Sequence, residues 1–267
     1  MVIDIHTHAW PEKVSLRARE TLESLFKIPF VGEPTIDLLL SYMDKNSIDV
    51  SVVACVATKP EQVPSINTWA LSVRSNRLKM FCAMHPDYPD WQRELLRIKE
   101  GGDGIKFQPE FQNFYVDDTR MFDMYAQIEN LGLPVLFHCG EELSQTMLVR
   151  SNPARLRAVH REFPGLKIIA GHFGGFQIWD ETRKFLLGED IYLETSYFIR
   201  FMPRDTVREM LLAHRADRLL FGSDFPLVDQ KIDIDCIKGL GLPKALEERI
   251  LFRNAQELLG IESRSTP

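Results

Sequence analysis

Short runs of apolar, largely β-branched residues recur along the chain, and each is followed by a segment with apolar residues at helical spacing. The runs predict eight strands, at residues 2–6, 50–56, 78–84, 104–107, 134–138, 167–171, 191–195 and 219–222. The segments between and after them predict eight helices, at residues 35–46, 61–75, 91–100, 119–130, 153–163, 177–187, 204–215 and 243–259. Strands and helices are therefore expected to alternate strictly.

The strand runs are apolar on both faces, which is typical of a parallel sheet covered by helices. Eight such units in 267 residues predict a single α/β domain, a (β/α)8 TIM barrel. An open doubly wound sheet is the alternative, but no Gly-x-Gly-x-x-Gly turn follows the first strand. We expect the barrel to span residues 1–262 and residues 263–267 to form a disordered tail. The long connection at 9–34 is a candidate lid or rim.

Composition narrows the range of partners. The formal net charge is −6 and no basic block opposes it, so neither nucleic acid nor an anionic membrane is an expected partner. The first residues lack the pattern of a signal peptide, and no apolar run reaches the roughly 20 residues of a membrane span. Four cysteines lie far apart without a Cys-x-x-Cys pair, which is typical of free thiols. These features predict a cytoplasmic protein with a small-molecule substrate; assembly into a homo-oligomer stays open.

Six polar residues stand at predicted strand ends or directly after them. They are His6 and His8 on the first strand, Lys106 on the fourth, His138 on the fifth, His172 on the sixth and Asp224 after the eighth. Strict alternation places Asp4, His6 and His8 on one face, which we expect to be the barrel interior. All six would converge at the carboxyl-terminal mouth, where barrel enzymes carry their active sites.

The four histidines and the aspartate are ligand types for zinc, manganese or iron. One histidine at a strand end is more often a packed core or rim residue than a ligand. A convergent set is much harder to attribute to packing. The pattern therefore predicts a catalytic site with a divalent metal, most simply zinc, as one ion or two.

The ordered set of strand-end residues resembles the amidohydrolase superfamily. The supporting segments are I-D-I-H-T-H at 3–8, G-I-K-F-Q-P-E-F-Q-N-F-Y-V-D-D at 104–118, G-S-D-F-P at 222–226 and N-A-Q-E-L-L-G at 254–260. Within the superfamily the chain looks like the amidohydrolase-related (amidohydrolase 2) branch. That branch contains metal-dependent hydrolases and also decarboxylases of the aminocarboxymuconate-semialdehyde and resorcylate types.

This resemblance implies that His6, His8, His138 and Asp224 contact the metal. It makes His172 either a second-metal ligand or a residue that orients and protonates substrate. Lys106 has two interpretations: a carboxylated lysine bridging two metals, or a plain amine beside one metal, which we favour. Gln108 departs from this resemblance, because many relatives carry a histidine at that position.

Three classes of function fit these residues. We favour a metal-dependent hydrolase that directs a metal-activated water at an ester, lactone or amide, with Asp224 as the proton carrier. The alternative is a non-oxidative decarboxylase of a small aromatic or unsaturated acid, in which His172 or Asp224 protonates the carbon. A barrel without catalysis, serving only for binding, leaves the full set of strand-end residues unexplained.

Substrate contacts are expected from loops on the same face. Trp10 and Tyr197 follow predicted strands and are candidates for the wall of a pocket for a planar substrate. Arg150 and Arg200 are candidates for holding a substrate carboxylate, although a solvated surface role competes for both. His85 follows the third strand, where a substrate contact and a hydrogen-bonded rim role are equally compatible with its position.

Overall fold

A computed structural model describes residues 1–143 and 148–262 of the chain. Eight parallel strands form one sheet in the order β1 to β8, and β1 meets β8 through the amide of Ile5, which donates to the carbonyl oxygen of Phe221 at 2.9 Å. The strands span Ile3–Thr7, Val50–Ala54, Leu78–Ala83, Gly104–Phe107, Val135–Phe137, Ile168–Ala170, Tyr192–Glu194 and Leu219–Leu220. The predicted (β/α)8 barrel is therefore confirmed.

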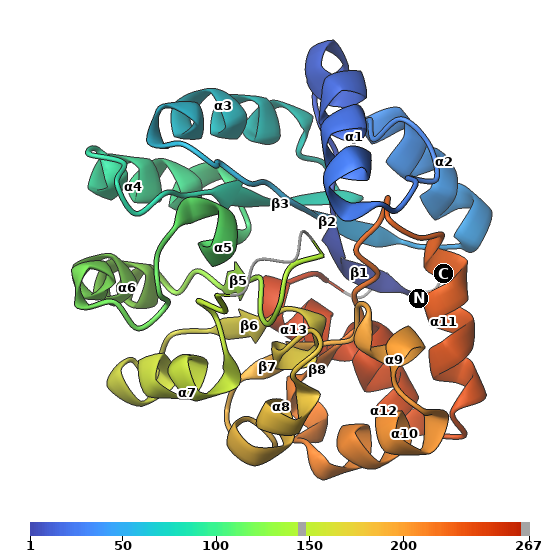
Figure 1. Ribbon diagram of the computed structural model, residues 1–267. Coiled ribbons are helices and arrows are strands. Elements are labelled where there is room, and N and C mark those ends of the chain that lie inside the picture. Colours follow the sequence, from blue (N-terminus) through green and yellow to red (C-terminus); the bar gives the residue numbers. More distant parts are fainter. Residues whose placement is uncertain (144–147, 263–267) are drawn as a thin grey trace.

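Helices surround the sheet on all sides (Figure 1). Helices α1 to α7 span Glu12–Phe26, Ile36–Asn46, Val63–Val73, Trp91–Gly101, Pro109–Gln112, Phe122–Leu131 and Pro153–Glu162. Helices α8 to α13 span Trp179–Phe185, Phe198–Phe201, Arg204–Ala213, Gln230–Gly239, Lys244–Glu248 and Asn254–Leu259. No helix in the described part of the chain is both long and apolar enough to cross a bilayer.

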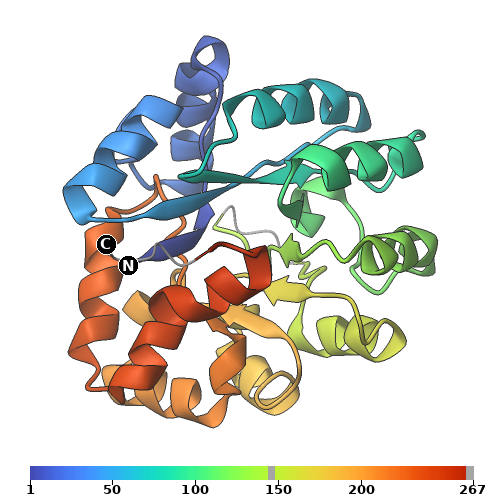
Figure 2. The ribbon, with the colours of Figure 1, turned by 180° about the vertical axis from the view of Figure 1, so that it is seen from behind.

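Two layers of apolar side chains hold the barrel together. An outer layer lies between strands and helices, and an inner cluster fills the barrel with residues such as Ile5, Phe81 and Leu136. Ala255 and Leu258 of α13 belong to that inner cluster, and the red carboxyl-terminal helices lie across the back of the barrel in Figure 2. The interior is thus filled from one end, which leaves the opposite end, the mouth, free for polar residues.

The first strand departs from strict alternation. Its pairing with β2 shifts by one position between Asp4 and Thr7, as in a β-bulge. Ile3 and Ile5 pack in the inner cluster, whereas Asp4 accepts a hydrogen bond from Gln230 of α11 at 2.6 Å. The expectation that Asp4 shares the interior face with His6 and His8 is therefore wrong, because the bulge resets the alternation before His6.

Four helices lie where no helix was predicted: α1, α5, α9 and α11. Of these, α1 occupies the 9–34 connection that was expected to be a lid or rim. The predicted helix at 243–259 is interrupted by a π-helical turn at Arg249–Arg253. The expected tail at 263–267 lies outside the described residues.

Candidate metal centre and active site

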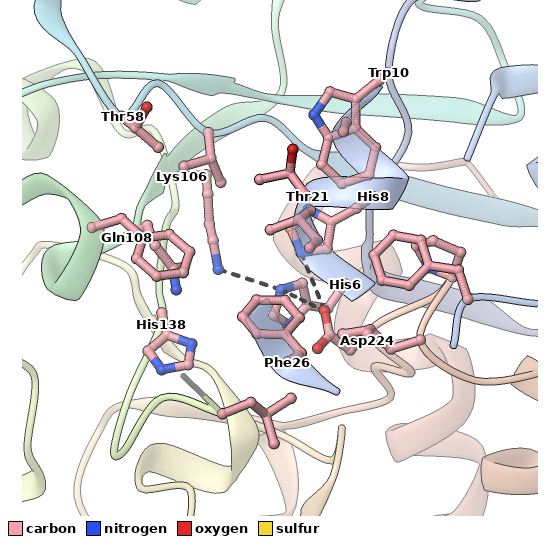
Figure 3. Close-up of a pocket in the computed structure, with 18 of the residues that line it drawn as sticks. His6, His8, Trp10, Thr21, Phe26, Thr58, Lys106, Gln108, His138 and Asp224 are labelled. Carbon is pink, nitrogen blue, oxygen red and sulfur yellow. Dashed lines mark hydrogen bonds and ion pairs between the residues drawn. The ribbon is translucent and has the colours of Figure 1, made fainter. Parts of the chain in front are cut away.

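Three of the predicted residues form a compact cluster at the mouth. His6 lies near the end of β1, His8 directly follows that strand, and Asp224 follows β8. The Oδ1 atom of Asp224 lies 3.1 Å from Nε2 of His8 and 3.6 Å from Nε2 of His6. One ligand atom from each residue falls within 4.8 Å of the others, and Figure 3 shows the three side chains pointing toward one another. Two imidazoles and a carboxylate at this spacing can hold one divalent metal ion.

The far sides of both histidine rings are fixed by hydrogen bonds. Nδ1 of His6 lies 3.1 Å from Oε1 of Glu194, and Nδ1 of His8 lies 2.8 Å from the carbonyl oxygen of Ala54. These acceptors place the ring proton on Nδ1 and leave the Nε2 lone pair facing Asp224. Metal-binding histidines are oriented in the same way by carboxylate and carbonyl partners. The donor set therefore fits a metal in chemistry as well as in spacing.

Glu194 was not predicted, although it ends β7 as the other residues end their strands. It is fully buried and accepts hydrogen bonds from the backbone amides of His172 at 2.5 Å and Ser196 at 2.8 Å. Burial alone would raise its pKa, but His6, His172 and these hydrogen bonds lower the pKa of Glu194 to about 2. The signal in the sequence that could have revealed Glu194 is a carboxylate within an otherwise apolar strand.

Lys106 reaches the cluster from β4. Its Nζ lies 3.3 Å from Nε2 of His6, and the side chain is buried (Figure 3). Burial lowers the pKa of the Lys106 ammonium, while the carboxylates of Asp224 and Glu194 oppose that shift. Because of its distance from His6, the side-chain nitrogen of Lys106 lies close enough to bind an anionic group at the metal position.

His138 and His172 form a second arm of the site. Nε2 of His172 lies 3.0 Å from Nδ1 of His138, whose Nε2 lies 3.1 Å from Oε1 of Glu142. Nδ1 of His172 lies 2.8 Å from Oγ of Ser196, which donates to Glu194. The resulting chain, from Glu142 through both rings and Ser196 to Glu194, can carry a proton. Glu142 was not predicted.

The two rings differ in their relation to the metal cluster. His172 forms a second possible ligand group with His6 and Glu194, while His138 belongs to neither group of the described residues. Burial lowers the pKa of His172 to about 4 and that of His138 well below its usual value. Both rings are therefore neutral at pH 7. A ligand role for His138 stays a prediction.

The backbone is constrained where the site residues leave the strands. His172, Tyr197 and Asp224 have φ angles of 53°, 59° and 64°, in the left-handed region that non-glycine residues rarely adopt. Such conformations cost of order 1–3 kcal/mol each and are retained when the surrounding structure fixes them. Their concentration at the mouth is typical of a functional site.

A cavity of about 620 Å³ opens above the cluster. Its walls include Trp10 and Tyr197, as expected for a pocket that takes a planar group, together with Phe176. Lys106, Gln108, His138 and Glu142 also line it, as do His6, His8, His172 and Asp224.

The structure brings none of the other three predicted substrate contacts to the cavity. Arg200 is held by Asp233 of α11, with Nε 2.7 Å from Oδ1. Arg150 donates to the side-chain oxygen of Asn113 at 2.6 Å, and the ring of His85 is turned toward its own loop. For the two arginines the tertiary partner, which sequence position does not reveal, holds the side chain outside the cavity, whereas His85 is held by its own loop.

The fold and the strand-end cluster together define a metal-dependent barrel enzyme. The family model Amidohydro_2, described as Amidohydrolase, matches residues 3–261, and the chain belongs to this family. No curated protein matches the sequence significantly.

Solved structures share the fold. An uncharacterized TIM-barrel protein from Bordetella bronchiseptica is 18% identical, with a TM-score of 0.74 over 97% of this chain and 98% of its own. A dihydroxybenzoic acid decarboxylase from Polaromonas sp. JS666, with bound manganese and the inhibitor 2-nitroresorcinol, is 18% identical, with a TM-score of 0.72 over 97% of both chains. A 2,6-dihydroxybenzoate decarboxylase from Rhizobium is 18% identical, with a TM-score of 0.72 over 98% of this chain and 99% of its own.

Proposed function

We propose that this protein is a metal-dependent, non-oxidative decarboxylase of a small aromatic or unsaturated carboxylic acid. The observation that carries the proposal is the cluster of His6, His8 and Asp224 at the base of a cavity with aromatic walls, with Lys106 beside it. Similar folds described as dihydroxybenzoate decarboxylases add support. Sequence alone favoured hydrolysis, so the comparisons reverse the order of the two candidates.

A divalent metal would be held by His6, His8 and Asp224, with His138 as an additional proposed ligand. When bound, it supplies a Lewis acid that draws a substrate carboxylate and a neighbouring oxygen into the site. Zinc fits the donor set, and manganese, which is bound in the Polaromonas protein, fits equally. We propose one metal and a Lys106 side chain that is not carboxylated, whose nitrogen, 3.3 Å from Nε2 of His6, stays free to bind an anionic group.

The protein's own residues would handle the substrate and the proton. The Lys106 ammonium binds the substrate anion, and Trp10 and Tyr197 exclude water from the ring face. With substrate bound, Nε2 of His172 takes up a proton from the side of His138 and donates it to the carbon that carries the carboxylate, which returns the ring to its neutral form. The bond between that carbon and the carboxylate then breaks, its electron pair returns to the unsaturated system, and carbon dioxide leaves. His138 lies within hydrogen-bonding distance of His172, and Glu142 within hydrogen-bonding distance of His138. These two groups can therefore resupply His172 with a proton.

Hydrolysis is the second candidate, because the matching family is described as Amidohydrolase. Asp224 would then accept the proton of the attacking water and pass it to the leaving group. The two candidates differ in product: only decarboxylation releases carbon dioxide and leaves a new carbon–hydrogen bond.

The test is a parallel assay of the metal-loaded protein with 2,6-dihydroxybenzoate and related aromatic acids, and with esters, lactones and amides. In D₂O, decarboxylation should release carbon dioxide and place one deuterium on the carbon that lost it. The His6→Ala/His8→Ala variant should retain the fold, lose the metal and be inactive. Turnover of esters or amides alone, or full activity in metal-free protein, would contradict the proposal.

We also propose a small-molecule partner and a cytoplasmic location. The four cysteines are all free in the structure, and three of them are buried, which suits a reducing compartment.

A further inference from the structure

The cavity extends well beyond the metal centre. Its 620 Å³ lies within the range of pockets for drug-sized ligands, roughly 300–1,000 Å³. A single substituted ring would leave much of this volume to water. The additional space is bounded by α1 and α3, which lie side by side at the upper edge of the barrel in Figures 1 and 2.

Helix α1 turns an apolar face toward this space. Val14, Ala18, Leu22 and Phe26 follow one another at intervals of four residues, and all of them line the cavity. Ser15 is the only buried residue of α1, and none of the apolar side chains of α1 belongs to the described core clusters. An amphipathic helix usually buries its apolar face against a core, but this face has no such core partner among residues 1–143 and 148–262.

The opposite wall of the extension comes from α3, through Ile66 and Trp69. Both side chains are half-buried against the core, so this wall is fixed. Phe111 of α5 adds a ring that stacks with Phe26 at a centroid distance of 6.4 Å. In Figure 3, Phe26 and Thr21 of α1 lie beside Trp10 and the metal cluster. The apolar space is therefore continuous with the metal site.

Two cations stand where this space meets solvent. Lys13 and Arg17 of α1 line the cavity, and both are exposed. Neither side chain forms an ion pair with any residue in the described ranges 1–143 and 148–262. An exposed pair of cations at the rim of an apolar channel favours a ligand that ends in an anionic group.

We propose that the substrate is a carboxylic acid whose reacting head lies at the metal centre and whose apolar arm extends between α1 and α3. The arm ends in a second anionic group beside Lys13 and Arg17. The inference rests on the proposed decarboxylase function for the identity of the head group, but the arm is argued from the cavity alone. The substrate class is thus an extended, amphipathic diacid rather than a simple benzoate.

Binding distinguishes the two proposals, because it can be measured without turnover. Calorimetry on manganese-loaded protein would compare 2,6-dihydroxybenzoate with derivatives that carry alkyl arms of two, four and six carbons at ring position 3 or 4. Affinity should rise by up to about fourfold per buried methylene for at least one position. Equal affinity for all arm lengths at both positions would overturn the arm. Binding that follows arm length without carbon dioxide release would contradict only the decarboxylase proposal.

A filled channel provides the second test. Ala18→Phe should reduce the gain in affinity that the longest arm provides by at least tenfold. Leu16→Phe is the matched control, because Leu16 lies on the same helix, is 53% exposed and does not line the cavity. Its affinity series should equal that of the wild type. Identical series for Ala18→Phe and the control would overturn the arm.

The anionic end is tested with six-carbon arms that end in a carboxylate or in a neutral primary amide. The carboxylate should bind a few-fold better than a neutral primary amide of the same length, and added salt should reduce that difference. Lys13→Gln/Arg17→Gln should abolish the difference and leave the dependence on arm length in place. No preference for the carboxylate in the wild type would overturn the terminal anion.

Discussion

Glu194 links the residues that define the centre. It contacts the ring of His6, the backbone amide of His172 and the hydroxyl of Ser196, and it is fully enclosed. Carboxylates in this position fix the ring and raise the basicity of a metal-binding histidine. Because Glu194 is buried, a substitution there would leave several hydrogen-bond donors without an acceptor, and this would destabilise the folded protein.

Glu194→Gln should therefore weaken metal binding by 10- to 100-fold, the usual range for partners of metal-binding histidines. The amide cannot accept as many hydrogen bonds as the carboxylate, so the ring of His6 loses its fixed orientation. Competition with a fluorescent chelator measures the affinity, and circular dichroism checks the fold. Glu189→Gln, in the loop before β7, is the control. Wild-type metal affinity in a folded Glu194→Gln protein would contradict this role.

Asp224 is the only carboxylate of the His6, His8 and Asp224 group. Its replacement by an amide therefore shows how much its negative charge contributes to metal binding and turnover. In the hydrolytic candidate, where Asp224 carries the proton, Asp224→Asn should reduce kcat by roughly 10²–10⁴. In the decarboxylase, where Asp224 only binds the metal, the loss of turnover should follow the loss of metal. Turnover and metal content are measured on the same preparation. Asp235→Asn, on the exposed face of α11, should behave as the wild type. A variant that retains metal and most of its turnover would disprove an essential role for Asp224.

Among single residues, those at strand ends carried most of the information in the sequence about the site. The approach of His6, His8, Lys106 and Asp224 follows from the common edge of parallel strands. Ring orientation does not follow from it, which is why the pairing of His138 with His172 and Glu142 could not be predicted. The partners of Arg150 and Arg200 are likewise set by packing between distant elements.

Among the elements, strands were easier to predict than helices. All eight strands lie within their predicted ranges or within one residue of them, because burial on both faces gives continuous apolar runs. Helix α1 was missed because the 9–34 connection was interpreted as a lid or rim, although its apolar residues recur at intervals of four. The β1 bulge was missed because one extra residue leaves no mark in an apolar run.

Two glycines test how closely the elements pack. A Cβ atom on Gly104 of β4 would lie 2.5 Å from the ring of Phe81, while one on Gly239 of α11 would meet nothing within 4 Å. Gly104→Ala should destabilise the protein by about 1–3 kcal/mol through overpacking. Gly239→Ala should stabilise it by up to about 1 kcal/mol, because alanine loses less conformational freedom in a helix.

Urea unfolding followed by circular dichroism gives both free energies, and the two variants serve as controls for each other. The opposite signs are the essential result. A Gly104→Ala protein as stable as the wild type would mean that β3 and β4 can separate without cost, against the packing described here.

For the whole molecule, pH dependence follows from buried groups that lie away from the metal centre. Glu110 of α5 accepts hydrogen bonds from the backbone amides of Arg150 at 2.8 Å and Ser151 at 3.2 Å. Asp233 pairs with Arg200, and His214 lies between the amide of Gly188 and the carbonyl oxygen of Ile191. Each of these groups ties together segments that are distant in the sequence.

Burial sets the direction of the shifts. It raises the pKa of Glu110 and of Asp233 to about 7, and it lowers the pKa of His214 to about 4. A carboxyl group with a raised pKa releases its proton on unfolding, so its contribution to stability falls as pH rises from about 4 through 7. A histidine with a lowered pKa takes up a proton on unfolding, so stability falls as pH drops from about 6.5 to 4.

Between about pH 4.5 and 6.5 the two carboxyl groups and His214 act in opposite directions, and the two carboxyl groups outweigh the one histidine. These three groups therefore predict a net fall in the free energy of unfolding of the metal-free protein as pH rises from about 5 to 8. For Glu110, a shift from 4.5 to about 7 corresponds to up to about 3 kcal/mol between pH 4 and pH 8. Urea titrations in EDTA at pH 5, 6, 7 and 8.5 measure the profile. Glu110→Gln should make this decline shallower, and His214→Gln should make it steeper below about pH 6.5, while Glu100→Gln, exposed on α4, should change neither. A decline that is unchanged in Glu110→Gln would show that this carboxyl group is already ionised in the folded protein, and would remove the basis of the prediction.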